Sequence, residues 1–155
     1  MVQLVDTTPM SAEMALLAAA IDRFCERPTA DRSAGDLTHL RHQCDRLELK
    51  FSEIGNAFAA TGEYDRQGFV SPIHWIRVNC HMGSGAVADR LAVGEHLNDL
   101  PASVEAMAGG EIGFTHLALI ARTAAAIAET ATGKPLEERP LLDKAREFSV
   151  GRFRD

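Results

Sequence analysis

Within residues 71–125, the spacing of several side chains best fits a chemical task. They are the arginines, the histidines and Ser84. Short apolar segments there are separated by Met82-Gly83-Ser84, by Pro101 and by Gly109-Gly110. Short helices joined by tight turns are typical of a helix-turn-helix that reads nucleic acid. The segment after the first turn would then be the reading helix. Five residues would contact DNA, namely Arg77, His81, Ser84, Arg90 and Arg122.

Two interpretations of this segment remain open. In the first, Arg90 pairs with guanine or a phosphate, while Arg77, His81 and Arg122 hold the DNA backbone. The net charge of the segment argues against this interpretation, because residues 71–125 contain three arginines and five acidic residues. A protein holds phosphates with lysine and arginine, so an acidic segment binds DNA poorly. In the second interpretation the same helices are a packing unit that contacts no DNA.

Other chemistry has weaker support in the sequence. His39 and His42 share a helix face, but Cys44 belongs to an apolar series and a fourth zinc ligand is lacking nearby. Cys80 and His81 are neighbours, and neighbours on a helix point about 100° apart, which does not suit a nucleophile and its base. The sequence therefore predicts no catalytic residue in this chain, no metal, no cofactor and no small-molecule substrate.

Two further side chains have structural interpretations. Trp75 lies in a short helix and is predicted to anchor the core between helices rather than to stack on a base. His116 lies near the start of a helix, and we expect it to cap that helix or to bond the preceding turn.

Apolar periodicity predicts the helices that position these residues, and the fold class is all-α. Helices over about 11–26 and 36–60, the second with Asp36 as N-cap, form a long hairpin within 10–61. A cluster of shorter helices with a helix-turn-helix-like unit covers 71–131, with Ser84 as a cap, and a terminal helix covers 141–150. The sixth helix of the chain is expected to run from about 115 to 131.

The second helix carries apolar residues in alternating steps of three and four, which average 3.5 and indicate a coiled-coil-like seam. The seam consists of Leu37, Leu40, Leu47, Phe51, Ile54 and Phe58, with Cys44 in the same series. It fits either an intrachain core against the first helix or the seam of a homodimer.

Composition bounds the remaining possibilities. At 155 residues the default is a single helical domain, and the net charge of −6 argues against a strong generic hold on DNA. Three dispersed cysteines suit a reducing cytoplasm. The sequence has no signal-peptide pattern and no apolar run long enough to cross a membrane, so the predicted location is cytoplasmic.

Several short motifs occur in a specific order between residues 37 and 146 and carry a family resemblance. They are Trp75-Ile76-Arg77, Ala88-Asp89-Arg90-Leu91, Leu97-Asn98-Asp99-Leu100-Pro101, Ala108-Gly109-Gly110-Glu111-Ile112 and residues 115–122. With these motifs the chain resembles the actinobacterial domain-of-unknown-function family 222, the N-terminal domain of many HNH-endonuclease-like proteins. Residues 97–121 also resemble, more weakly, the DNA-reading helical domain of chromosome-partition proteins.

The resemblance implies an actinobacterial, cytoplasmic helical protein whose nuclease module, where there is one, lies C-terminal to this domain. An apolar and basic end follows the last predicted helix, and we interpret the chain as an N-terminal fragment of a longer protein. No nuclease residue can be carried over, so any nuclease activity would lie in the missing module. The leading hypothesis is a non-catalytic module for DNA contact, self-association or both, and the alternative is a protein–protein interaction module without DNA binding.

Overall fold

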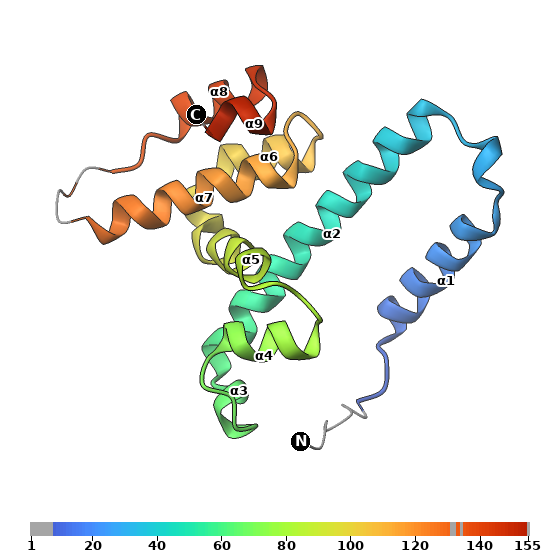
Figure 1. The fold of residues 1–155 in the computed structure, drawn as a ribbon, viewed down its shortest axis with the longest axis horizontal. Coiled ribbons are helices and arrows are strands. Elements are labelled where there is room, and N and C mark those ends of the chain that lie inside the picture. Colours follow the sequence, from blue (N-terminus) through green and yellow to red (C-terminus); the bar gives the residue numbers. More distant parts are fainter. Residues whose placement is uncertain (1–7, 131–132, 134, 155) are drawn as a thin grey trace. The chain divides into compact units, whose positions relative to one another are not determined.

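The structure of the chain is a computed structural model that describes residues 8–130, 133 and 135–154 (Figure 1). Within these ranges every regular element is a helix, which confirms the predicted all-α fold. The chain divides into two compact units, residues 1–38 and 39–155, where the sequence predicts one domain. No helix among the described residues is both long and apolar enough to cross a membrane.

The first unit contains α1 (Ala12–Glu26) and the short 3-10 helix η1 (Thr29–Asp31). The Ser11 hydroxyl caps α1 by accepting a hydrogen bond from the Met14 amide at 3.2 Å, so the helix bounds predicted for 11–26 are confirmed. No residue of α1 is buried. Its exposed apolar side chains include Met14, Leu16, Ile21 and Phe24.

The 28-residue helix α2 (Ala34–Thr61) begins two residues before the predicted start. The Ser33 hydroxyl accepts from the Asp36 amide at 3.2 Å, and the Asp36 carboxylate accepts from the Ser33 amide at 2.7 Å. This reciprocal pair is a capping box with an aspartate in the place of the usual glutamate. Ser33 is therefore the capping residue, and Asp36, which the sequence predicts as the cap, is its partner in the first turn. Hydrogen bonds from Ser33 lower the pKa of the Asp36 carboxyl.

The remaining helices of the second unit follow α2 along the chain. They are α3 (Glu63–Arg66), α4 (Pro72–Asn79), α5 (Ser84–His96), the 3-10 helix η2 (Leu97–Asp99), α6 (Pro101–Ala108), α7 (Phe114–Glu129), α8 (Glu138–Glu147) and α9 (Val150–Arg154). The predicted terminal helix is wrong in its bounds, since α8 begins at Glu138 and a separate helix follows Ser149. Pro140 fits inside α8 because the first turn of a helix needs no amide donor there.

Two other helix ends differ from the prediction. Ser84 is the first residue of α5 rather than its cap, because Gly83 has the extended conformation of an N-cap residue. The α7 helix ends at Glu129, and residue 131, where the sequence predicts its end, lies outside the described residues.

The core of the second unit forms where α5 and α7 pack against each other. Its fully buried side chains include Val87, Val93, Leu100, Met107, Leu117 and Ile120. Leu142 and Ala145 of α8 and Phe153 of α9 close this core from the C-terminal side. The core therefore holds α5 in place, and α5 in turn receives one face of α2.

Candidate functional site

The face of α2 that packs on the second unit is polar and small rather than apolar. Asp45, Ser52 and Gly55 are its buried residues. A Cβ atom placed on Gly94 of α5 would lie 2.2 Å from the Ser52 carbonyl oxygen, so the two backbones approach closely there. The Ser52 hydroxyl donates to the Glu48 carbonyl at 2.8 Å, which satisfies that buried polar group.

The apolar face of α2 is exposed along most of its length. We define the α2 stripe as Leu37, Leu40, Cys44, Leu47, Phe51 and Ile54. The exposed fractions are 71% for Leu37, 43% for Leu40, 44% for Leu47 and 60% for Ile54. The stripe lies one residue out of step with the buried series, hence about 100° around the helix. From Leu40 to Ile54 the strongest coiled-coil pattern in the sequence is therefore on the surface of the second unit.

An open hollow of about 300 Å³ interrupts the α2 stripe near its middle. It is lined by Cys44, Leu47, Glu48 and Phe51, which are spaced i, i+3, i+4 and i+7. Four residues with this spacing form the hole that receives a side chain of a facing helix in a coiled coil. The hollow gives the stripe a shape suited to a second helix.

The seam predicted from the sequence extends one position further, to Phe58. The Phe58 ring lies 4.5 Å from the Trp75 ring and 6.4 Å from the Tyr64 ring, measured between centroids. The Trp75 indole donates to the Gln67 side chain at 2.8 Å. Trp75 thus joins α4 to the end of α2, and the exposed part of the seam ends at Ile54.

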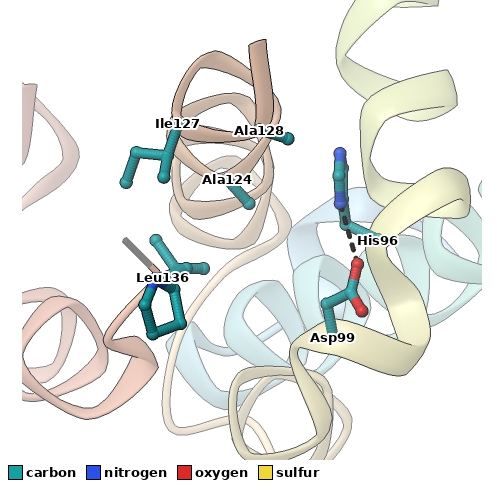
Figure 2. Close-up of a pocket in the computed structure, with 7 residues that line it drawn as sticks. His96, Asp99, Ala124, Ile127, Ala128 and Leu136 are labelled. Carbon is teal, nitrogen blue, oxygen red and sulfur yellow. Dashed lines mark hydrogen bonds and ion pairs between the residues drawn. The ribbon is translucent and has the colours of Figure 1, made fainter. Parts of the chain in front are cut away.

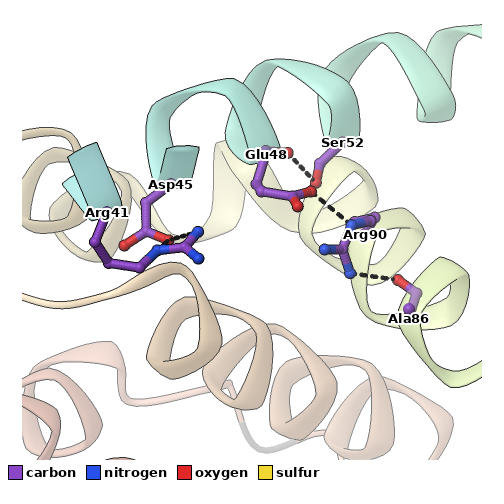
Figure 3. A network of polar contacts seen from close by, with 6 residues as sticks. All are labelled: Arg41, Asp45, Glu48, Ser52, Ala86 and Arg90. Carbon is purple, nitrogen blue, oxygen red and sulfur yellow. Dashed lines mark hydrogen bonds and ion pairs between the residues drawn. The ribbon is translucent and has the colours of Figure 1, made fainter. Parts of the chain in front are cut away.

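Arg90, the predicted base-reading arginine, is turned toward α2 (Figure 3). Its Nε donates to the Glu48 carboxylate at 2.6 Å and its Nη1 to the Ala86 carbonyl at 2.8 Å. The Arg90 side chain is 17% exposed, and its guanidinium carbon lies 5.2 Å from the Phe114 ring centroid. Two of its nitrogens are therefore engaged within the fold, and the bond to Glu48 ties α5 to α2.

The other four predicted DNA contacts are exposed. Arg77 on α4, His81 in the turn and Ser84 at the start of α5 surround the connection between these two helices. His81 has a φ of 54°, which the tight turn imposes. Arg122 on α7 lies apart from them and faces Asp89 at 3.7 Å. The structure thus gathers three of the five residues at one turn.

A polar cleft of about 360 Å³ adjoins the start of α7 and was not predicted from the sequence. Asp45 accepts from the Arg41 Nε at 3.0 Å and Nη2 at 2.7 Å, and only 8% of Asp45 is exposed (Figure 3). The N-cap of α7 is Gly113, which has no side chain to offer, and the Asp45 carboxylate lies beside it. A negative charge stabilises the positive end of a helix, so the position of Asp45 beside the start of α7 is electrostatically favourable.

His116 also belongs to the cleft, and its predicted capping role is confirmed. Its Nδ1 accepts from the Gly113 amide at 3.4 Å, and its Nε2 lies 2.9 Å from the Phe148 carbonyl oxygen. An accepting Nδ1 and a donating Nε2 assign the neutral tautomer. The ring therefore joins the start of α7 to the chain between α8 and α9, which is a structural task.

A second cavity, of about 340 Å³, lies beside His96 and Asp99 (Figure 2). The His96 Nδ1 lies 3.0 Å from the Asp99 carboxylate, and Ala124, Ile127 and Leu136 face the pair from the opposite wall. No described lining residue carries a nucleophilic hydroxyl or thiol. The histidine and aspartate therefore have no partner for covalent catalysis in this cavity.

The two histidines considered as zinc ligands, His39 and His42, have different surroundings. His39 is exposed, whereas the half-buried His42 ring packs against Gly110, whose φ of 84° ends α6. Within residues 8–130, 133 and 135–154, no three histidine, cysteine or acidic side chains form a group that could hold a metal ion.

No family model, no curated protein and no solved structure matches this chain. The resemblance to family 222 accordingly stays a prediction from the sequence. The function must be inferred from the exposed stripe of α2 and from the turn between α4 and α5.

Proposed function

We propose that this chain is a non-catalytic helical module that self-associates through the α2 stripe. The observation that carries the proposal is the exposure of Leu37, Leu40, Leu47 and Ile54 along one line of a long helix. A contiguous apolar surface on a water-soluble fold marks an interaction site more often than scattered apolar residues do. The 3.5-residue average spacing and the hollow lined by Leu47 support a helix as the partner.

The exposed area is sufficient for a weak affinity. Burying a large aliphatic side chain contributes about 1.5–3 kcal/mol, and these four are each about half exposed, hence about 1 kcal/mol apiece. A symmetric pair would gain roughly 8 kcal/mol from eight such side chains, part of which offsets the lost translational and rotational freedom. With that cost at about 4 kcal/mol, the lower end of its range, about 4 kcal/mol remains, and we expect a dissociation constant on the order of a millimolar.

Light scattering of matched variants tests the proposal. Leu47→Asp places a charge beside the hollow and should give a monomer at concentrations where the parent chain is a dimer. Val70→Asp is the control, because Val70 is 86% exposed and lies outside α2. Loss of association in Leu47→Asp alone supports the proposal, whereas equal association in both variants contradicts it. A parent chain that stays monomeric throughout would favour the rival function, capture of another protein.

DNA contact is a second candidate function, and the exposed Arg77, His81 and Ser84 around the α4–α5 turn favour it. A fluorescence titration with duplex DNA at low salt tests it, because phosphate contacts weaken as salt rises. Arg77→Ala should weaken binding, and Arg46→Ala on exposed α2 is the control. Equal affinities of the two variants, or negligible binding by the parent chain, would remove this candidate.

The motifs that resemble family 222 extend the proposal to the location of the protein and to a partner domain. They support a cytoplasmic protein in which this module assembles a nuclease-like partner domain encoded in the same reading frame. The sequence of the gene beyond codon 155 tests that extension, since it either encodes an HNH motif in frame or does not.

A further inference from the structure

We infer that the helix received by the α2 stripe is α2 of a second copy of this chain, parallel and in register, with Leu47 opposite Leu47. This inference rests on the proposed self-association and adds the identity and orientation of the partner. Three properties of the described residues carry it: the shape of the hollow, the position of the second unit on α2, and the charges beside the stripe.

The hollow fixes which side chain enters it. In heptad terms Leu37, Cys44 and Phe51 are a positions, Leu40, Leu47 and Ile54 are d positions, and Glu48 is an e position. The hollow is lined by Cys44, Leu47, Glu48 and Phe51, hence by positions a, d, e and a. In a parallel pair this hole receives the d residue at the same height of the facing helix. Leu47 of the second copy is that residue.

The position of the second unit on α2 selects the parallel orientation. The rest of that unit contacts α2 from His42, which packs against Gly110, to Gly55, which packs against Leu91. The buried residues of this contact, Asp45, Ser52 and Gly55, lie on average about 100° around the helix from the stripe. In a parallel pair the two-fold axis runs along the helices and places the two attached units on opposite sides.

An antiparallel pair would place both attached units on the same side, because its two-fold axis is perpendicular to the helices. Matching the ends of the stripe would set Leu37 opposite Ile54. The attachment region 42–55 of one copy would then face residues 36–49 of the other. The two attached units would compete for the same space over residues 42–49, so this arrangement is disfavoured.

The charges and the area fit a second copy. In a parallel pair each g position faces the next e position of the other helix, which sets Asp36 opposite Arg41 and Gln43 opposite Glu48. Lys50 faces Gly55, so no like charges meet. The stripe extends over about 26 Å, and a two-stranded contact of that length buries on the order of 1,000 Å², the lower bound for a specific interface.

Cysteine crosslinking reads out the orientation directly. In Cys25→Ser/Cys80→Ser, Cys44 is the remaining thiol, and in a parallel pair it lies opposite Cys44 of the second copy. Diamide should then convert the two thiols into one disulfide, with its own N=N bond reduced to a hydrazine. Adding Leu47→Asp should abolish this crosslink because the dimer is lost.

Two further positions separate the possible outcomes. After Cys44→Ser is added, Leu37→Cys and Ile54→Cys are made as separate variants, with thiols about 25 Å apart along one helix. A disulfide needs Cα atoms within about 7 Å, so the parallel pair predicts a crosslink in each variant alone. Crosslinks only in the mixture of the two variants would show an antiparallel dimer and overturn this inference while leaving self-association intact. A monomer in light scattering with no crosslink in any variant would overturn the proposed function as well.

Discussion

Replacing Gly94 by alanine probes the packing of α2 most sharply, since the added methyl has no room. Its Cβ would lie 2.2 Å from the Ser52 carbonyl oxygen and 2.7 Å from the Asn56 Cβ. The first of these is a backbone atom, so the two helices must move apart rather than one side chain rotate. Overpacking costs about 1–3 kcal/mol, and we place this site at the upper end.

The intrinsic helix preference of alanine acts in the opposite direction. It is worth about 1 kcal/mol over glycine inside a helix and offsets part of the overpacking. The net expectation for Gly94→Ala is a loss of about 2 kcal/mol, which lowers Tm by about 4–8 °C for a chain of this size. Circular dichroism during heating and urea unfolding would measure both quantities.

A glycine of the same helix provides the matched control. Nothing lies within 4 Å of a Cβ placed on Gly85, near the start of α5. Gly85→Ala should therefore leave stability unchanged or raise it by up to about 1 kcal/mol. A Gly94→Ala protein as stable as Gly85→Ala would refute the inward packing of the polar face, and with it the outward position of the stripe.

Three more predictions concern the polar contacts. A double-mutant cycle of Glu48→Ala and Arg90→Ala should give a coupling of about 1–2 kcal/mol in urea unfolding, and a coupling near zero would contradict the half-buried ion pair. His116→Ala should lose about 1–2 kcal/mol and speed proteolysis near Phe148, where an unchanged cleavage rate would argue against the bond between them. The pKa of Asp36 is lowered in the fold, so its stabilising effect is complete above its ordinary pKa of about 3.9 and is lost as pH falls through the folded pKa. The backbone amide of residue 33 lowers this pKa most and is kept in Ser33→Ala. The NMR titration midpoint of Asp36 should lie below the ordinary value and rise in part in Ser33→Ala, and equal midpoints would exclude the serine hydroxyl as a cause.

The helices could be predicted from the sequence because their ends carry local signals. Ser11 marks a predicted start that the structure confirms, and Ser71 and Pro101 lie at the starts of α4 and α6. Local signals were less decisive where two residues could cap the same helix, as at Ser33 and Asp36. They also missed the true start of α8, whose first turn contains Pro140.

The direction in which α2 faces could not be read from periodicity. Apolar residues at 3.5-residue spacing predict a buried seam, and that series is complete from Leu37 to Phe58. The neighbouring face of α2, which carries Asp45, Ser52 and Gly55, is buried instead. Gly94 of α5 lets the backbones of the two helices approach more closely there than large side chains would. A glycine inside a helix, together with a small-residue series on another helix, was the available signal.

The ion pair of Arg90 shows a second limit of sequence reasoning. The position of Arg90 after a turn suggested an arginine that reads DNA bases. In the structure its partner is Glu48, which lies 42 residues earlier in the chain. A long-range pair of this kind has no local signature, so the sequence could not distinguish a reading arginine from one that holds two helices together.

Sedimentation equilibrium of the unmodified chain tests the central claim most directly. With increasing concentration the average mass should rise from the monomer value of 16.8 kDa toward twice that value, with a midpoint on the order of a millimolar. A mass that stays at 16.8 kDa across this range, with Leu47→Asp indistinguishable from the parent, would contradict self-association through the α2 stripe.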